Sequence, residues 1–244
     1  MKDGSRRAIL AAFFANLGIA CAKFAAWAAT GAASMLAEGV HSLADTGNQG
    51  LLLLGSARAR RAPDAEPPFG YGTERYFWAF VVSLVLFLMG GRFALWEGID
   101  KLRHPHEISA AAWAGGVLLV GIVFEGFSLR TAVVESNKLR GSSSWWSFVR
   151  GSKKPELPVV LLEDTGALLG LLFALAGVLL SVFLHDPRFD AAASAAIGAL
   201  LCSISVLLSI EMKSLLIGES ASPRDLLAIR HALAETPRVR RIIH

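Results

Sequence analysis

Residues 33–55 read Ala-Ser-Met-Leu-Ala-Glu-Gly-Val-His-Ser-Leu-Ala-Asp-Thr-Gly-Asn-Gln-Gly-Leu-Leu-Leu-Leu-Gly. As a helix, this stretch is long enough to cross a bilayer, because about 20 residues span the hydrocarbon core. Ala, Leu, Val and Gly fill most of it, and its acidic, imidazole and amide side chains lie nearly on one line: Glu38, His41, Asp45, Asn48 and Gln49. A carboxylate at the bilayer centre costs about 3 kcal/mol on insertion scales, so such a line persists only where it faces protein, water or an ion.

Within that line, His41 and Asp45 are four residues apart and project from the same face of a helix. Imidazole and carboxylate can together ligate one divalent cation. The alternative to a metal site is a seam of hydrogen bonds between helices that holds no ion. For a single polar residue in a membrane helix, that seam would be the favoured interpretation. Five polar residues on nearly one line favour a functional site.

The composition is that of a membrane protein. Of the 244 residues, 54% are hydrophobic, and the mean hydropathy is +0.50, which is far above that of a soluble domain. The net charge of +4 is typical of basic cytoplasmic loops. We find no basic patch with interleaved aromatic residues and expect no nucleic-acid partner. We also find no nucleophile–base pair, phosphate loop or cofactor fingerprint, so an enzyme is not expected.

Apolar runs predict six transmembrane helices, at about 8–30, 33–55, 77–99, 111–134, 158–184 and 190–212. Most of the Lys and Arg residues between these spans fall on one side of the membrane. By the positive-inside rule, both termini are expected in the cytoplasm.

Two later spans also carry acidic residues. Glu125 lies near the middle of the fourth span, and an ionisable residue there indicates a functional site. Glu163 and Asp164 are adjacent in the fifth span and point about 100° apart, so only one can face the second span directly. Trp145 and Trp146, beside basic residues, predict an anchor at the inner membrane surface.

After the sixth span, residues 222–234 carry a helix-start signal and an amphipathic pattern, and residues 239–244 alternate like a strand. One helix and one strand cannot make a core of their own. The sequence therefore predicts that the chain stops inside a second domain.

Two motifs make the chain resemble the cation diffusion facilitator family, whose members are divalent-metal/proton antiporters. The first is Gly-Ala-Ala-Ser-Met-Leu-Ala-Glu-Gly-Val-His-Ser-Leu-Ala-Asp at 31–45, and the second is Pro-Phe-Gly-Tyr-Gly-Thr-Glu-Arg at 68–75. Asn-Gln at 48–49, Trp-Trp at 145–146 and Leu-Glu-Asp at 162–164 make it most similar to the branch that includes the mitochondrial zinc transporters of animals.

This resemblance implies an all-α membrane protein with a six-helix cation efflux domain at 1–213. It also implies that residues 214–244 hold the first helix and strand of an incomplete, C-terminally truncated, ferredoxin-like cytoplasmic domain. The expected partners are a divalent metal ion, protons, the lipid membrane and a second copy in a homodimer. The bacterial inner (plasma) membrane is the expected location.

The resemblance also implies a transport site. His41 and Asp45 match the ligand pair of the second span, and Asp164 matches the second position of the fifth-span pair. Val160 stands where the family usually has His. Three ligands remain, and water or one of three side chains would complete the shell: Asn48, Glu163 and Glu125. Zn²⁺ tolerates three protein ligands plus water, whereas a more oxygen-rich shell would favour Mn²⁺ or other harder divalent cations.

The expected function is therefore exchange of a divalent cation, zinc first, for protons by alternating access. The ligands would couple the two, since metal binding requires their deprotonation. Alternatives are a non-transporting scaffold or regulatory subunit of the same family, a transporter of manganese or another divalent cation, and a passive ion channel.

Overall fold

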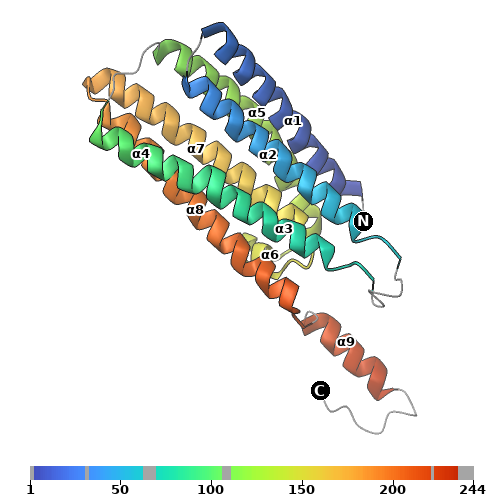
Figure 1. Cartoon of the computed structure of the whole chain (residues 1–244). Helices are drawn as coiled ribbons and strands as arrows, with labels where there is room; N and C mark the ends of the chain where they lie inside the picture. Colours follow the sequence, from blue (N-terminus) through green and yellow to red (C-terminus); the bar gives the residue numbers. More distant parts are fainter. Residues whose placement is uncertain (1–2, 31–32, 63–69, 106–110, 221–222, 236–244) are drawn as a thin grey trace.

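The computed structural model describes residues 3–30, 33–62, 70–105, 111–220 and 223–235, and these form a bundle of long helices (Figure 1). The elements in chain order are α1 (Asp3–Thr30), α2 (Ala33–Arg58), α3 (Glu74–Val85), the π-helical η1 (Leu86–Arg92), α4 (Phe93–Arg103), α5 (Ala111–Arg140), α6 (Trp145–Gly151), α7 (Glu156–Leu184), α8 (Arg188–Ile217) and α9 (Pro223–Ala234). The continuous run of α3, η1 and α4 acts as one long helix.

Long helices occupy all six places where spans were expected. Four stretches of the described residues are long and apolar enough to cross a membrane, namely 74–103, α5, α7 and α8. In α1 the apolar stretch is shorter, Ile9–Ala22. The molecule is therefore an all-helical protein with membrane-spanning helices, while the count of six spans and the cytoplasmic position of both termini stay predictions.

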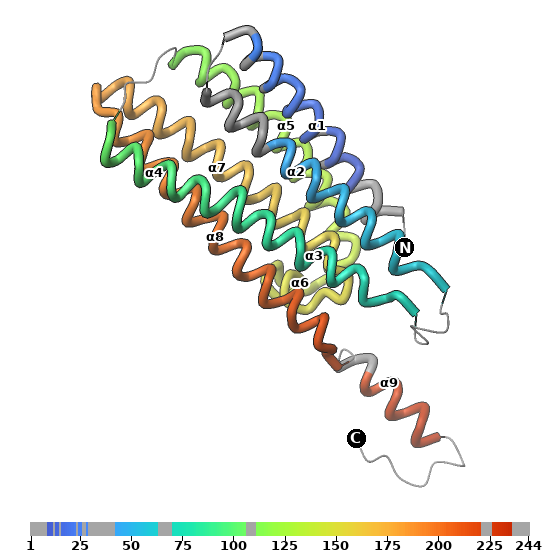
Figure 2. The backbone as a smooth tube through the Cα atoms, in the orientation of Figure 1, coloured from blue at the N-terminus to red at the C-terminus, as the bar shows by residue number. Residues whose placement is uncertain are grey.

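One end of the bundle carries the short helix α6, and we name it the α6 end. The chain alternates between the two ends, so α2, α5 and α8 finish at the α6 end and α3 and α7 begin there, as the tube in Figure 2 shows. Helix α9 lies beyond it (Figure 1). The expected helix after the sixth span is thus present, and no described residue is in a strand. The strand expected at 239–244 lies outside the described residues.

Helices α4 and α8 are held close by two glycines. A Cβ atom on Gly98 would collide with the backbone of Ala195, and one on Gly198 would collide with the backbone of Leu95. Small residues let helix backbones approach in a membrane, where dispersion contacts replace the hydrophobic drive. Helix α7 in turn packs against both α5 and α8. These contacts hold α7 in the middle of the bundle.

Helix α7 begins where its sequence permits. Pro155 precedes its first residue, and Pro158 lies in the first turn, where the missing backbone N–H would have no helical partner anyway. From there the face of α7 that includes Val160 and Asp164 is buried against the other helices, with exposures of 0% and 1%. The same helix thus provides both a membrane span and the deepest acidic residues.

Candidate metal centre

Buried acidic side chains distinguish the interior of this bundle. The described buried polar residues include seven that α2, α5 and α7 contribute at one level: Asp45, Asn48, Gln49, Glu125, Ser128, Glu163 and Asp164. Among the described residues that are buried, several are Asp or Glu and none is Lys, Arg or His. Burying negative charge is costly unless a proton, a cation or hydrogen bonds offset it, so this interior favours protons or a cation.

Glu163 is the acid that faces α2. Its Oε1 accepts a hydrogen bond from Asn48 Nδ2 at 2.7 Å, and its Oε2 accepts one from Gln49 Nε2 at 3.0 Å. Gln49 in turn accepts a long, 3.5 Å hydrogen bond from Asn16 Nδ2 of α1. Both oxygens of Glu163 are therefore engaged by amides, which ties α1, α2 and α7 together.

Asp164 points the other way, toward α5. Its Oδ2 accepts a 2.7 Å hydrogen bond from the Ser128 hydroxyl. Adjacent helical residues diverge by about 100°, and here that divergence sends Glu163 to one neighbour and Asp164 to another. Of the two acids, Glu163 is thus the one hydrogen-bonded by side chains of α2, while Asp164 is hydrogen-bonded from α5 and still lies within electrostatic range of Asp45 of α2.

These acids act on one another. Glu163 is close enough to interact electrostatically with Asp45, Asp164 and Glu125. Asp164 interacts in the same way with Asp45. Asp45 is 6% exposed and Glu125 is 6% exposed. The structure therefore brings the predicted residues of α2, α5 and α7 into one buried neighbourhood.

The predicted ligand His41 lies in α2, one turn before Asp45, but its side chain is outside the described set. The same holds for the side chain of Glu38. Among the side chains that the structure does describe, no three His, Cys, Asp or Glu are grouped closely enough to hold a metal ion. The described acids are thus neighbours, but their carboxylates do not converge on one position where they could hold an ion together.

The three candidates for a fourth ligand differ in what is left to coordinate. Glu163 uses both oxygens as hydrogen-bond acceptors. Glu125 is buried near Glu163. Asn48 donates its amide N–H to Glu163, while its carbonyl Oδ1 is buried and accepts no hydrogen bond from the residues that the structure describes. Glu125 Oε2 is likewise a buried oxygen without a hydrogen bond from the described residues, although Glu125 interacts with another residue. Asn48 and Glu125 therefore each keep a buried oxygen that could serve as the fourth ligand.

Ser128 was missed at the level of sequence. A serine in a long apolar helix is unremarkable by itself, but Ser128 lies three residues after Glu125 and therefore on the same face. That spacing was the available signal. Its hydroxyl orients the Asp164 carboxylate, as outer hydrogen bonds commonly do for metal ligands.

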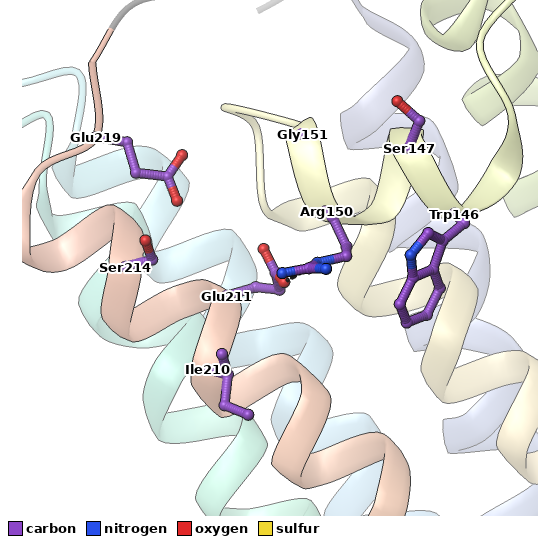
Figure 3. Close-up of a pocket in the computed structure, with 8 residues that line it drawn as sticks. All are labelled: Trp146, Ser147, Arg150, Gly151, Ile210, Glu211, Ser214 and Glu219. Carbon is purple, nitrogen blue, oxygen red and sulfur yellow. Dashed lines mark hydrogen bonds and ion pairs between the residues drawn. The ribbon is translucent and has the colours of Figure 1, made fainter.

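A separate hollow lies at the α6 end and holds none of the predicted ligands. It has a volume of 470 Å³ and is lined by residues of α6, the end of α8 and the chain after it, as Figure 3 shows. Arg150 Nε donates to Glu211 Oε1 at 2.9 Å, and the Arg150 guanidinium lies 5.7 Å from the centre of the Trp146 ring. These contacts attach α6 to α8. Trp146 is exposed, and its predicted role as a membrane anchor stays a prediction.

Apolar spanning helices around a buried acidic neighbourhood define an integral membrane protein with a polar interior. Residues 9–217 match the family described as the cation efflux transmembrane domain. The chain therefore belongs to the cation efflux family, which consists of transporters and not of enzymes.

Several relatives align along nearly the whole chain. The human "Proton-coupled zinc antiporter SLC30A9, mitochondrial" is 35% identical over 242 residues, which is 98% of this chain and 42% of that protein. "Metal tolerance protein C4" of Arabidopsis thaliana is 30% identical over 91% of this chain and 49% of its own length. "Zinc transporter ZitB" of Escherichia coli is 26% identical over 100% of this chain and 73% of its own length. The chain thus spans less than half the length of the human and plant relatives.

Proposed function

We propose that this protein transports a divalent cation, with Zn²⁺ as the first candidate, in exchange for protons. One observation carries the proposal: described buried side chains from α2, α5 and α7 include neighbouring acids and no buried base. Such an interior suits a cation that binds reversibly. Family membership and relatives named as zinc transporters support the same substrate.

In the proposed site, the ligands are His41 and Asp45 from α2 and Asp164 from α7, with Asn48 Oδ1 as the fourth protein ligand. Glu163 positions Asn48 through the 2.7 Å hydrogen bond, and Ser128 positions Asp164. Glu125 adds negative charge nearby. An Asp-, Asn- and His-containing shell accepts Zn²⁺ and would also accept Mn²⁺.

The exchange follows from the chemistry of those ligands. His must be neutral and the carboxylates ionised to bind metal, so binding on one side releases protons and protonation on the other side expels the metal. Helices would rock around the fixed site to expose it alternately to the two sides. The chain is proposed to act as a homodimer in the bacterial inner membrane.

The test is transport by purified protein in liposomes with an imposed pH gradient. With equal zinc concentrations inside and outside at the start, wild type should accumulate Zn²⁺ when the pH gradient is present. The substitutions Asp164→Asn and His41→Ala should each abolish this accumulation. Mn²⁺, measured in parallel, ranks the two cations. A Glu97→Gln variant, altered in a half-exposed surface pair with Lys101, is the control.

The outcomes separate the alternatives. Transport without coupling to protons and at channel-like rates would contradict the antiporter. Absence of both Zn²⁺ and Mn²⁺ transport in folded protein would favour a scaffold or regulatory subunit. Equal transport by wild type and Asp164→Asn would contradict the proposed site.

A further inference from the structure

Helices α5 and α7 run antiparallel with a register that two contacts fix. Ser128 lies opposite Asp164, to which it donates a hydrogen bond. Gly121 lies opposite Leu171, because a Cβ atom there would be 3.3 Å from a methyl carbon of Leu171. From Gly121 to Ser128 the chain advances seven residues in α5, and from Leu171 back to Asp164 it steps seven residues in α7. The two contacts therefore define the same register.

Extended toward the α6 end, this register places two further layers. Ala132 and Val160 share the next layer, with exposures of 1% and 0%. Ser136 and Glu156 share the layer after it, with exposures of 0% and 2%. The α5–α7 seam is therefore polar at Asp164, apolar for one turn, and polar again at Glu156.

The polar atoms of that last layer lack partners. Ser136 Oγ and Glu156 Oε1 are both buried, and neither has a hydrogen bond with a residue that the structure describes. An acid in the first turn of a helix is often explained by the exposed backbone N–H groups there, yet Glu156 Oε1 accepts none of them. By contrast, the neighbouring acid Glu135 is ion-paired with Lys138.

This layer lies just beneath the surface of the α6 end. Lys154, two residues before Glu156, is exposed. The Tyr76 hydroxyl donates to the Lys153 carbonyl at 3.1 Å and fixes this turn against α3, while the Lys153 ammonium pairs with Glu219. Asp164 lies two helical turns deeper, about 12 Å along α7.

We propose that Glu156 and Ser136 form a second station for the transported divalent cation, between the α6 end and Asp164. A carboxylate and a hydroxyl are oxygen ligands that suit a divalent cation retaining part of its water shell. The Ala132–Val160 layer separates the two stations and obliges the cation to shed water before it reaches Asp164. This inference rests on the proposed transport function and adds a residue pair to its route.

The experiment compares Zn²⁺ transport by Glu156→Gln and wild type in membrane vesicles of both orientations. With zinc on the α6 side, the variant should lose about tenfold in Vmax/KM through a raised KM, while Vmax at saturating zinc stays near that of wild type. With zinc on the opposite side Vmax/KM should fall by the same factor, because the ratio of Vmax/KM in the two directions is fixed by the driving force. From that side Glu156 lies on the exit path, so the loss should appear in Vmax while KM stays near that of wild type. The zinc affinity of the central site at equilibrium, measured by calorimetry, should also be unchanged, because the central ligands are intact.

Three further variants make the result specific. Ser136→Ala should show the same effect on KM from the α6 side at smaller size, and Glu156→Asp should restore much of the rate because the carboxylate is retained. Glu135→Gln, which removes a buried acid at the same end that already has a partner, should leave the kinetics unchanged. Retained Vmax/KM in Glu156→Gln, or a loss that falls on Vmax instead of KM when zinc is on the α6 side, overturns the proposal.

Asp164→Asn, assayed in parallel, keeps this proposal separate from the transport function. Loss of transport in Asp164→Asn together with normal kinetics in Glu156→Gln overturns the second station alone. Undiminished transport in Asp164→Asn overturns the proposed central site, whereas absence of Zn²⁺ transport by folded wild type overturns the proposed function and the second station with it.

Discussion

Asn48 and Glu163 are 115 residues apart in the sequence and form a 2.7 Å hydrogen bond that joins α2 to α7. Gln49 donates to the other oxygen of the same carboxyl. One acidic side chain thus accepts hydrogen bonds from the N–H groups of two buried amides. In an interior without competing water, such a network is held together only while each member has its partner.

Replacing Glu163 should therefore weaken the fold. In Glu163→Ala the amides of Asn48 and Gln49 lose their acceptor, and we expect a loss of about 2–4 kcal/mol in the free energy of unfolding. Glu163→Gln keeps an acceptor for one amide and should lose less. Thermal unfolding in detergent measures both. Equal stability of Glu163→Ala and wild type would contradict a structural role for this carboxyl.

Ser128 should act on metal affinity through Asp164. Ser128→Ala removes the hydroxyl that donates to Asp164 Oδ2, and loss of such an orienting bond typically costs about 10–100-fold in metal affinity. Calorimetric titration with Zn²⁺ gives the comparison. Ser205→Ala is the matched control, since in the described part of the chain that buried hydroxyl bonds the Leu201 carbonyl of its own helix. An equal drop in both variants would point to a general packing effect.

Val160→His should tighten zinc binding. Val160 lies one turn from Asp164 on the buried face of α7, so an imidazole there adds a nitrogen ligand beside the carboxylate. We expect at least about a tenfold gain in Zn²⁺ affinity and a smaller one for Mn²⁺, which prefers oxygen ligands. Val160→Leu tests the effect of added volume alone. Weaker zinc binding in Val160→His than in Val160→Leu would contradict the assignment of this position.

Helix packing predicts opposite effects on stability when two glycines are replaced by alanine. Gly198→Ala places a methyl group against the Leu95 backbone, so α4 and α8 must separate and stability should fall by about 1–3 kcal/mol. Gly115→Ala meets open space in α5 and should be neutral or slightly stabilising, because Ala favours helix. Unfolding midpoints of the two variants, measured together, check this contrast.

Outside the membrane-spanning segments, the Lys153 and Ser214 side chains hydrogen-bond the Glu219 carboxylate and hold its pKa below the ordinary value of 4.5. A carboxyl with a lowered folded-state pKa stabilises above its unfolded pKa and loses that contribution as pH falls through the folded value. The contact should thus persist at pH values where ordinary glutamates protonate. Carboxyl NMR titration should show the Glu219 pKa rising toward its ordinary value in Lys153→Gln. An unchanged pKa would contradict the pairing.

The sequence alone determined the helices and the acids within them. Apolar runs of about 20 residues satisfy their backbone groups only as helices in a membrane, so the six long helices could be placed before any contact was known. Spacing also placed Asp45, Asn48 and Gln49 near one face of α2. The amphipathic helix after the sixth span could be predicted for the same reason, from periodicity.

Only the tertiary structure decided what each acid faces. Glu163 and Asp164 diverge by a fixed angle, but the sequence could not say which one meets α2, because that depends on the rotation of α7 about its axis. Packing against α5 and α8 sets that rotation, turning Glu163 to Asn48 and Asp164 to Ser128. The same packing sets the register that brings Ser136 level with Glu156, a juxtaposition that no spacing within one helix could reveal.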